Sequence, residues 1–149
     1  MKKIGSSTLL AVSDAGRCRL FHLDKTKQLV EFQSLLNAEA RQAEDQLVTD
    51  RPGRGHDKKG SGRHAKAPRT SAKETATRHF AKSIAAELQA ASSSYHALIL
   101  VAPPAFLGLL RHALDATTRA KVRLEIDKDL TYFGPLEIQC SVNEVLENS

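Results

Sequence analysis

The apolar residues of this chain change their spacing partway along it, and that change most constrains the fold. In the first third, three short segments are rich in strand-forming residues: Thr8–Ser13, Arg17–Leu23 and Leu29–Leu35. Asp14-Ala15-Gly16 is a typical turn sequence. Because short turns favour pairing between strands that are neighbours in sequence, these segments predict a three-stranded antiparallel meander.

The second half of the chain alternates between helical and strand patterns. Apolar residues recur at helical spacing over Ser71–Ala91, which opens with the capping-box pattern Ser71-Ala72-Lys73-Glu74. His96–Ala102 is a continuous apolar run, typical of a strand covered on both faces, and Pro103-Pro104 ends it. The remaining predicted elements are a helix over residues 106–114, a strand over Val122–Ile126 and a helix over Pro135–Leu146.

The order of these elements predicts the fold class. With 149 residues and 41% hydrophobic residues, the chain can bury one core without a metal or a disulfide. Three meander strands followed by helix, strand, helix, strand, helix match an α/β, ribonuclease H-like layout. We therefore expect one domain over residues 1–149, with a mixed five-stranded sheet and a long basic, Gly-rich loop.

Positive charge is concentrated between Arg51 and Lys73. Eight of the 22 basic residues and one of the 17 acidic residues lie there, so the segment has a net charge of +7 and the rest −2. It holds four of the eight glycines and no large apolar residue, which predicts a mobile loop over residues 51–70. An anionic partner, most plausibly RNA, would contact this loop. The alternative is a solvated insertion that only aids solubility. The candidate contacts are Arg51, Arg54, Lys58, Lys59, Gly60, Gly62, Arg63, His64, Lys66 and Arg69.

Carboxylates follow two of the predicted strands. Asp14 ends the first strand, and Asp127 and Asp129 follow the fifth, an arrangement that a two-metal nuclease would need. The fourth strand, however, ends in Ala102-Pro103-Pro104 and supplies no acid. Asp14 also suits a turn, and residues 127–131 either lead into a helix capped by Thr131 or form a polar site beside Asp14 and Arg17.

Other catalytic and targeting signals are weak. There is no Gly-x-Ser-x-Gly sequence, and no metal site or cofactor is indicated. Cys18 and Cys140 suit two buried small side chains better than a redox pair. The apolar patch Leu9–Val12 is too short for a signal peptide, and no apolar run approaches a membrane span. We therefore expect a cytoplasmic protein.

Several motifs resemble those of the bacterial host attachment protein family. They are Asp50–Arg54, Gly60–Ala65, Val101–Arg111 and Glu125–Thr131, with Asp14, Arg17, Arg19 and Phe21 at the opening. The resemblance spans residues 8–142 in the expected order. The family is named for a requirement in attachment to host cells, which is a phenotype and not a mechanism.

The family is in turn similar to bacterial relatives of the central domain of the archaeo-eukaryotic peptide-chain release factor. There, a Gly-Gly-Gln loop promotes hydrolysis of peptidyl-tRNA on the ribosome. The Gly-rich loop of this chain occupies the same place in the element order but contains no glutamine between Gly60 and His64. The resemblance thus implies binding to ribosomal RNA or tRNA. The alternatives are an attachment-related contact with a protein or surface polymer, and hydrolysis of peptidyl-tRNA or nucleic acid. His64, Asp14, Asp127 and Asp129 are the weak catalytic candidates.

Overall fold

The computed structural model describes residues 8–23, 26, 28–42 and 58–148, and for residues 58–70 it describes the backbone alone. The predicted meander is confirmed. β1 (Thr8–Ser13) pairs antiparallel with β2 (Arg17–Leu23), and β2 pairs antiparallel with β3 (Leu29–Leu36). The β2–β3 register shifts between Leu20 and Phe21, as a β-bulge requires.

Two parallel strands complete the sheet. β4 (Ala97–Val101) pairs with β1, and β5 (Val122–Ile126) pairs with β4. The strand order β3-β2-β1-β4-β5 is that of a mixed five-stranded sheet, so the predicted α/β class is confirmed. β1, β4 and β5 run in the same direction, and their carboxyl ends therefore lie at one edge of the sheet. We call it the carboxyl edge.

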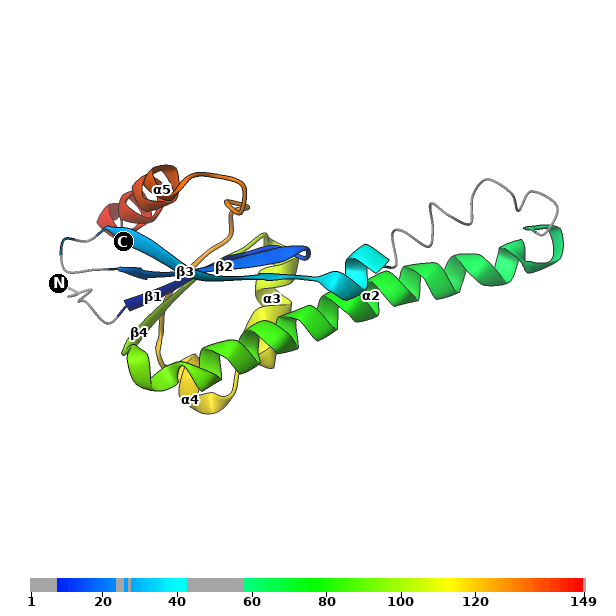
Figure 1. The fold of residues 1–149 in the computed structure, drawn as a ribbon, viewed down its shortest axis with the longest axis horizontal. Helices are drawn as coiled ribbons and strands as arrows, with labels where there is room; N and C mark the ends of the chain where they lie inside the picture. Colours follow the sequence, from blue (N-terminus) through cyan, green and yellow to red (C-terminus); the bar gives the residue numbers. More distant parts are fainter. Residues whose placement is uncertain (1–7, 24–25, 27, 43–57, 149) are drawn as a thin grey trace.

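Helices cover both faces of the sheet (Figure 1). On one face, α2 (Lys58–Ala90) and α3 (Pro104–Ala113) pack over a core that includes Leu9, Leu20 and Leu98. On the other face, α5 (Pro135–Asn148) covers a second core that includes Leu10, Phe21 and Ile99. β1 and β4 lie between the two cores, which is why they are apolar on both faces.

Two short elements in the second half of the chain were not predicted from the sequence. A 3-10 helix, η1 (Ser92–Ser94), follows α2, and α4 (Ala116–Ala120) precedes β5. Both contain small polar residues and lack the long apolar repeat by which a sequence reveals a helix.

The predicted start of the long helix at Ser71 is wrong. α2 begins at Lys58, so Ser71 and Glu74 lie inside the helix and do not cap it. Residues 58–70, expected in a loop, therefore have a helical backbone, while residues 51–57 lie outside the described residues. The physical reason is that a helix already nucleated by the packing of its C-terminal half extends at one hydrogen bond per added residue. The Lys, Arg and Ala residues of this segment favour a helix and offset the cost of its glycines.

The prediction for the cysteines holds for one of them. Cys18 is buried in β2, where burial raises the pKa of its thiol and Asp14 adds to the shift. Cys140 is exposed on α5, so the expectation that it is buried is wrong. It lies two residues after Ile138, which is buried against the sheet, and thus falls on the outer side of α5.

Candidate functional site

The carboxyl edge brings together residues from both ends of the chain. Asp14 follows β1, and its Oδ1 accepts hydrogen bonds from the backbone N–H groups of Gly16 and Arg17, at 2.8 and 2.9 Å. Residues 127–134 link β5 to α5 and pass over the same edge; we call them the strap. The Asp14 turn and the strap thus form one polar surface at this edge.

Thr131 joins the strap to the first turn. Its hydroxyl lies 3.0 Å from Asp14 Oδ2 and 3.0 Å from Asp129 Oδ1. The side chain is fully buried, and a hydroxyl has one proton, so it donates to one carboxylate at a time. Thr131 thus lies beside Asp14 and not at the start of α5, which begins at Pro135. Arg17 lies over the neighbouring Tyr132 ring, 5.0 Å from its centroid. A polar site formed by residues 127–131 stays a prediction.

The carboxylates at this edge do not form a recognisable metal centre. Asp14 and Asp129 meet at Thr131, but no contact in the described structure joins Asp127 to them. Among the residues that the structure describes, no group of three or more His, Cys, Asp or Glu side chains could hold a metal ion. Asp14, Thr131 and Asp129 instead join the turn after β1 to the strap, and we call these three residues the latch.

Arg19 is the residue that fixes the strap most firmly. Its Nε and Nη2 donate to the two carboxylate oxygens of Glu31 on β3, at 3.2 and 2.9 Å. Its Nη1 donates to the carbonyl oxygens of Thr131 and Phe133, at 3.0 and 2.7 Å. The rigid, planar guanidinium makes all four contacts at once, which a lysine could not do. Arg19 therefore ties β2, β3 and the strap together.

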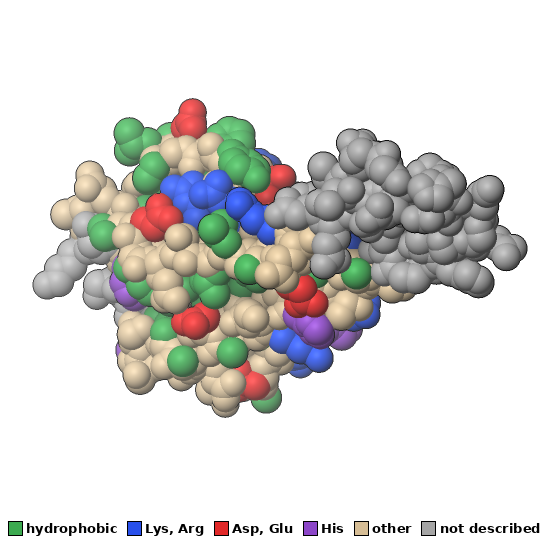
Figure 2. Space-filling model, turned by 45° about the vertical axis from the view of Figure 1, so that its right-hand side comes forward, with side chains coloured by type: hydrophobic (Ala, Val, Ile, Leu, Met, Phe, Trp, Pro, Cys, Tyr) green, Lys and Arg blue, Asp and Glu red, His purple; other side chains and the backbone are tan. Residues whose placement is uncertain are grey.

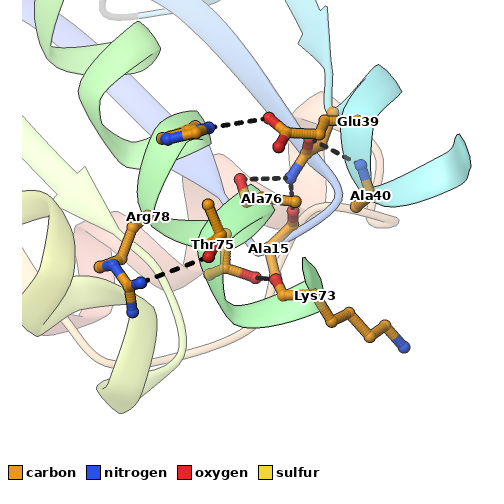
Figure 3. A network of polar contacts seen from close by, with 10 residues as sticks. Ala15, Glu39, Ala40, Lys73, Thr75, Ala76 and Arg78 are labelled. Atoms are coloured by element: carbon orange, nitrogen blue, oxygen red, sulfur yellow. Dashed lines mark hydrogen bonds and ion pairs between the residues drawn. The ribbon is translucent and has the colours of Figure 1, made fainter. Parts of the chain in front are cut away.

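The other half of the site is the attachment of α2 to this same edge (Figure 3). Asn37, which follows β3 and is 5% exposed, donates from Nδ2 to the carbonyl oxygens of Ala15 and Ala76, at 2.9 and 3.2 Å. Its Oδ1 accepts the N–H of Ala40, in a helical segment over residues 38–42. One buried amide thus joins the β1–β2 turn, α2 and that segment.

Two further contacts hold α2 against β3 and the helical segment that follows it. His79 Nδ1 lies 2.9 Å from Glu39 Oε1, and Gln33 Nε2 donates to Glu87 Oε1 at 3.1 Å. The packed part of α2 includes Ala76, Phe80 and the residues that follow them in the core. The N-terminal part of the helix continues past the sheet, away from the body of the molecule (Figure 1).

The candidate RNA contacts divide between two parts of the chain. The backbone of the predicted residues from Lys58 onward lies in α2, and Arg51 and Arg54 lie outside the described residues. The members in α2 are Lys58, Lys59, Gly60, Gly62, Arg63, His64, Lys66 and Arg69. The structure brings Asp14 and Asp129 together at the strap, whereas His64 belongs to the part of α2 of which the backbone alone is described.

Sequence reasoning missed the structural roles of Arg19 and Asn37. Arg19 was recognised only as part of a family motif, and Asn37 was not singled out. The available signal was the position of Arg19 on the same strand face as the apolar Phe21. An arginine at such a position buries its methylene groups and needs hydrogen-bond partners for its guanidinium.

Comparison with known proteins identifies the family. A family model described as "Protein required for attachment to host cells" matches residues 9–142. No curated protein matches the chain. In the described part of the chain, no helix has the length and apolar character needed to cross a membrane. Because the match to the family model covers most of the 149 residues, the chain belongs to the family of proteins required for attachment to host cells.

Proposed function

We propose that this protein binds RNA through the basic segment between Arg51 and Lys73. The observation that carries the proposal is the separation of charge: +7 in that segment against −2 in all the rest of the chain. Lysine and arginine that neutralise phosphates release condensed counterions, and this supplies most of the affinity for nucleic acid. The sequence resemblance to the release-factor domain is untested, and if it holds it makes the ribosome the first RNA to test.

The way α2 is held supports this proposal. Hydrogen bonds at Ala76, His79 and Glu87 tie the later part of the helix to β3 and to the segment that follows β3. The 33-residue helix is about 50 Å long at 1.5 Å per residue, so a segment beyond these contacts reaches well past the sheet. A partner with a broad phosphate surface can approach such a segment without meeting the body of the protein.

The spacing of the basic residues in the sequence gives further support. Lys59, Arg63, Lys66 and Lys73 are separated by four, three and seven residues. With 3.6 residues per turn, these positions share one side of a helical backbone. Several phosphates along one strand could then be contacted by one side of α2.

The test is equilibrium binding of a labelled single-stranded RNA across a salt series. The test variant carries Lys59→Ala, Arg63→Ala and Lys66→Ala, because alanine favours the helix and removes three charges. The matched control carries Arg78→Ala, Lys82→Ala and Arg123→Ala, which removes three charges from exposed side chains elsewhere.

The expected result is a change in salt dependence. Each phosphate contact in a single strand contributes about −0.7 to the log–log slope, so the test variant should lose about two units of slope and the control little. If both variants lose affinity equally, net charge alone attracts RNA and the proposed segment has no special role. If wild-type protein binds no RNA at low salt, the proposal is wrong.

An attachment-related contact with another protein is the second candidate. Its support is the family description together with exposed apolar side chains on the strap and α5, among them Tyr132, Phe133 and Leu136. Detection of the native protein on the surface of intact cells, with loss of attachment on changing these residues, would favour it over RNA binding.

A further inference from the structure

The strap exposes an aromatic ring on a segment that is otherwise firmly held. Tyr132 is 74% exposed and Phe133 45%, whereas Leu130 and Thr131 just before them are buried. Arg17, on β2, pairs in register with Leu36, itself 58% exposed. We call Arg17, Leu36, Tyr132 and Phe133 the edge patch. Figure 2 shows Lys and Arg side chains gathered among hydrophobic ones on the side of the molecule that carries α5.

The backbone on both sides of Tyr132 is pinned. Arg19 Nη1 donates to the carbonyl oxygens of Thr131 and Phe133, the residues that flank it. The Thr131 hydroxyl is bonded within the latch, and the N–H of Phe133 donates to the Leu130 carbonyl at 3.1 Å. A ring presented by a fixed backbone loses little conformational entropy when a ligand covers it. Tyr132 is therefore preorganised for contact.

Arg17 gives the ring a planar cationic neighbour. Its guanidinium carbon lies 5.0 Å from the Tyr132 ring centroid, within the range of a cation–π contact. Its Nε is buried and has no hydrogen-bond partner in the described structure. Aromatic rings and guanidinium planes are the two side-chain surfaces on which unpaired bases stack.

The patch lies next to the point where α2 is attached. Asn37 bonds to the carbonyl of Ala15 and, through its backbone N–H, to that of Gly16, in the turn that separates Asp14 from Arg17. The same Asn37 side chain bonds to Ala76 of α2. α2 and the edge patch lie on opposite faces of the sheet, and the turn between Asp14 and Arg17 is the point where they approach each other. A strand that binds along α2 would therefore have to pass around this turn to reach Tyr132. Charge complementarity with the +7 segment favours a nucleic-acid strand over an apolar peptide as the occupant.

We propose that the edge patch is a stacking platform for an unpaired base of single-stranded RNA, with Tyr132 as the ring that stacks and Arg17 as its support. The inference rests on the proposed RNA binding and deepens it, because it says which form of RNA is preferred. Paired bases are already stacked within a helix and cannot lie flat on Tyr132, so duplex RNA gains nothing from the platform.

The test compares three variants on two probes: a labelled 12-nucleotide adenosine strand and a 12-base-pair RNA duplex. Loss of one stacked base predicts that Tyr132→Ala weakens binding of the single strand by about 5- to 150-fold and leaves its salt slope unchanged. Tyr132→Phe should bind like wild type. Tyr132→Leu, which keeps apolar surface and removes the ring, should behave like Tyr132→Ala. Duplex affinity should change less than twofold in all three.

Intrinsic fluorescence gives a direct second readout. The chain has no Trp and only two Tyr residues, and Tyr95 is buried with its hydroxyl bonded to the Leu88 carbonyl. Stacking of a base on Tyr132 should quench tyrosine emission in wild type but not in Tyr132→Phe, after correction for RNA absorption with free tyrosine amide.

Each remaining outcome overturns a defined claim. If the Lys59, Arg63 and Lys66 variant loses salt slope but Tyr132→Ala binds the single strand like wild type, the platform is wrong and RNA binding stands. If Tyr132→Leu binds like wild type, the patch makes an apolar contact and not a base stack, and the platform is again wrong. If wild type binds neither probe, both proposals fail together.

Discussion

Replacing Arg19 by methionine should loosen the strap and lower the stability of the whole domain. Methionine keeps an apolar stem beside Phe21, over whose ring the Arg19 guanidinium now lies at 5.1 Å. The substitution removes two hydrogen bonds to Glu31 and two to strap carbonyls, at 2.7–3.2 Å. The Arg19 side chain is only 12% exposed, so water replaces these bonds poorly.

The size of the effect follows from where each bond lies. Glu31 is 33% exposed, so its ion pair is screened and contributes at most about 1 kcal/mol. The bonds to the Thr131 and Phe133 carbonyls come from a charged donor and contribute about 1 kcal/mol each after discounting their partial exposure. The total of about 3 kcal/mol corresponds to a fall in Tm of about 6–12 °C for a domain of this size.

Thermal unfolding and amide hydrogen exchange would measure this, with Arg111→Met as the matched control. Arg111 also makes a forked pair, with Glu125, but its side chain is 46% exposed, and its described partner is this one carboxylate. Arg19→Met should speed exchange at residues 130–134 while β1 and β4 stay protected. If the two variants lower Tm equally, or if amide hydrogen exchange in the strap does not change, the conclusion that Arg19 holds the strap in place is refuted.

Three further predictions concern the rest of the domain. Asn37→Ala should lower the free energy of unfolding by about 2–3 kcal/mol, measured by urea unfolding, because the backbone groups that now bond to the Asn37 amide would lose their partner. Lys121→Met should cost about 1–2 kcal/mol in the same assay, because Lys121 Nζ donates to the carbonyls of Ser92 and Tyr95. A thiol reagent at pH 8 should label Cys140 alone in native protein and both cysteines in urea. Because folding raises the pKa of Cys18 above its ordinary 9.0, the unfolded chain releases that proton first, and stability should fall as the pH rises above 9 and not below it.

The fold was predictable because the apolar residues of its strands and helices recur at regular spacing. β1, β2 and β5 have the predicted bounds, β3 extends one residue further, and β4 lies inside the predicted His96–Ala102. The start of α2 was not predictable from local residues, since the helix is nucleated by packing around Phe80 and Ile84, far along the chain from Lys58. Glycines disfavour a helix locally, but packing of the later part of α2 against the sheet stabilises the helix despite them.

The candidate site was predictable only in part. The sequence placed Asp14 and residues 127–131 at strand ends, and parallel strands bring such ends to one edge. It could not show that one hydroxyl, that of Thr131, joins Asp14 to Asp129, because such a contact depends on the path of the strap in three dimensions. No sequence pattern predicts that Tyr132 is exposed, since aromatic side chains are more often buried than exposed to solvent.

Co-sedimentation with ribosomes from the same cells tests the central claim most directly. Wild type, the Lys59, Arg63 and Lys66 triple alanine variant and the Arg78, Lys82 and Arg123 control would be run across a salt series. The account predicts saturable binding by wild type and control, with about two units less salt slope for the triple variant. Absence of saturable binding at low salt, or equal binding by both variants across the series, would contradict it.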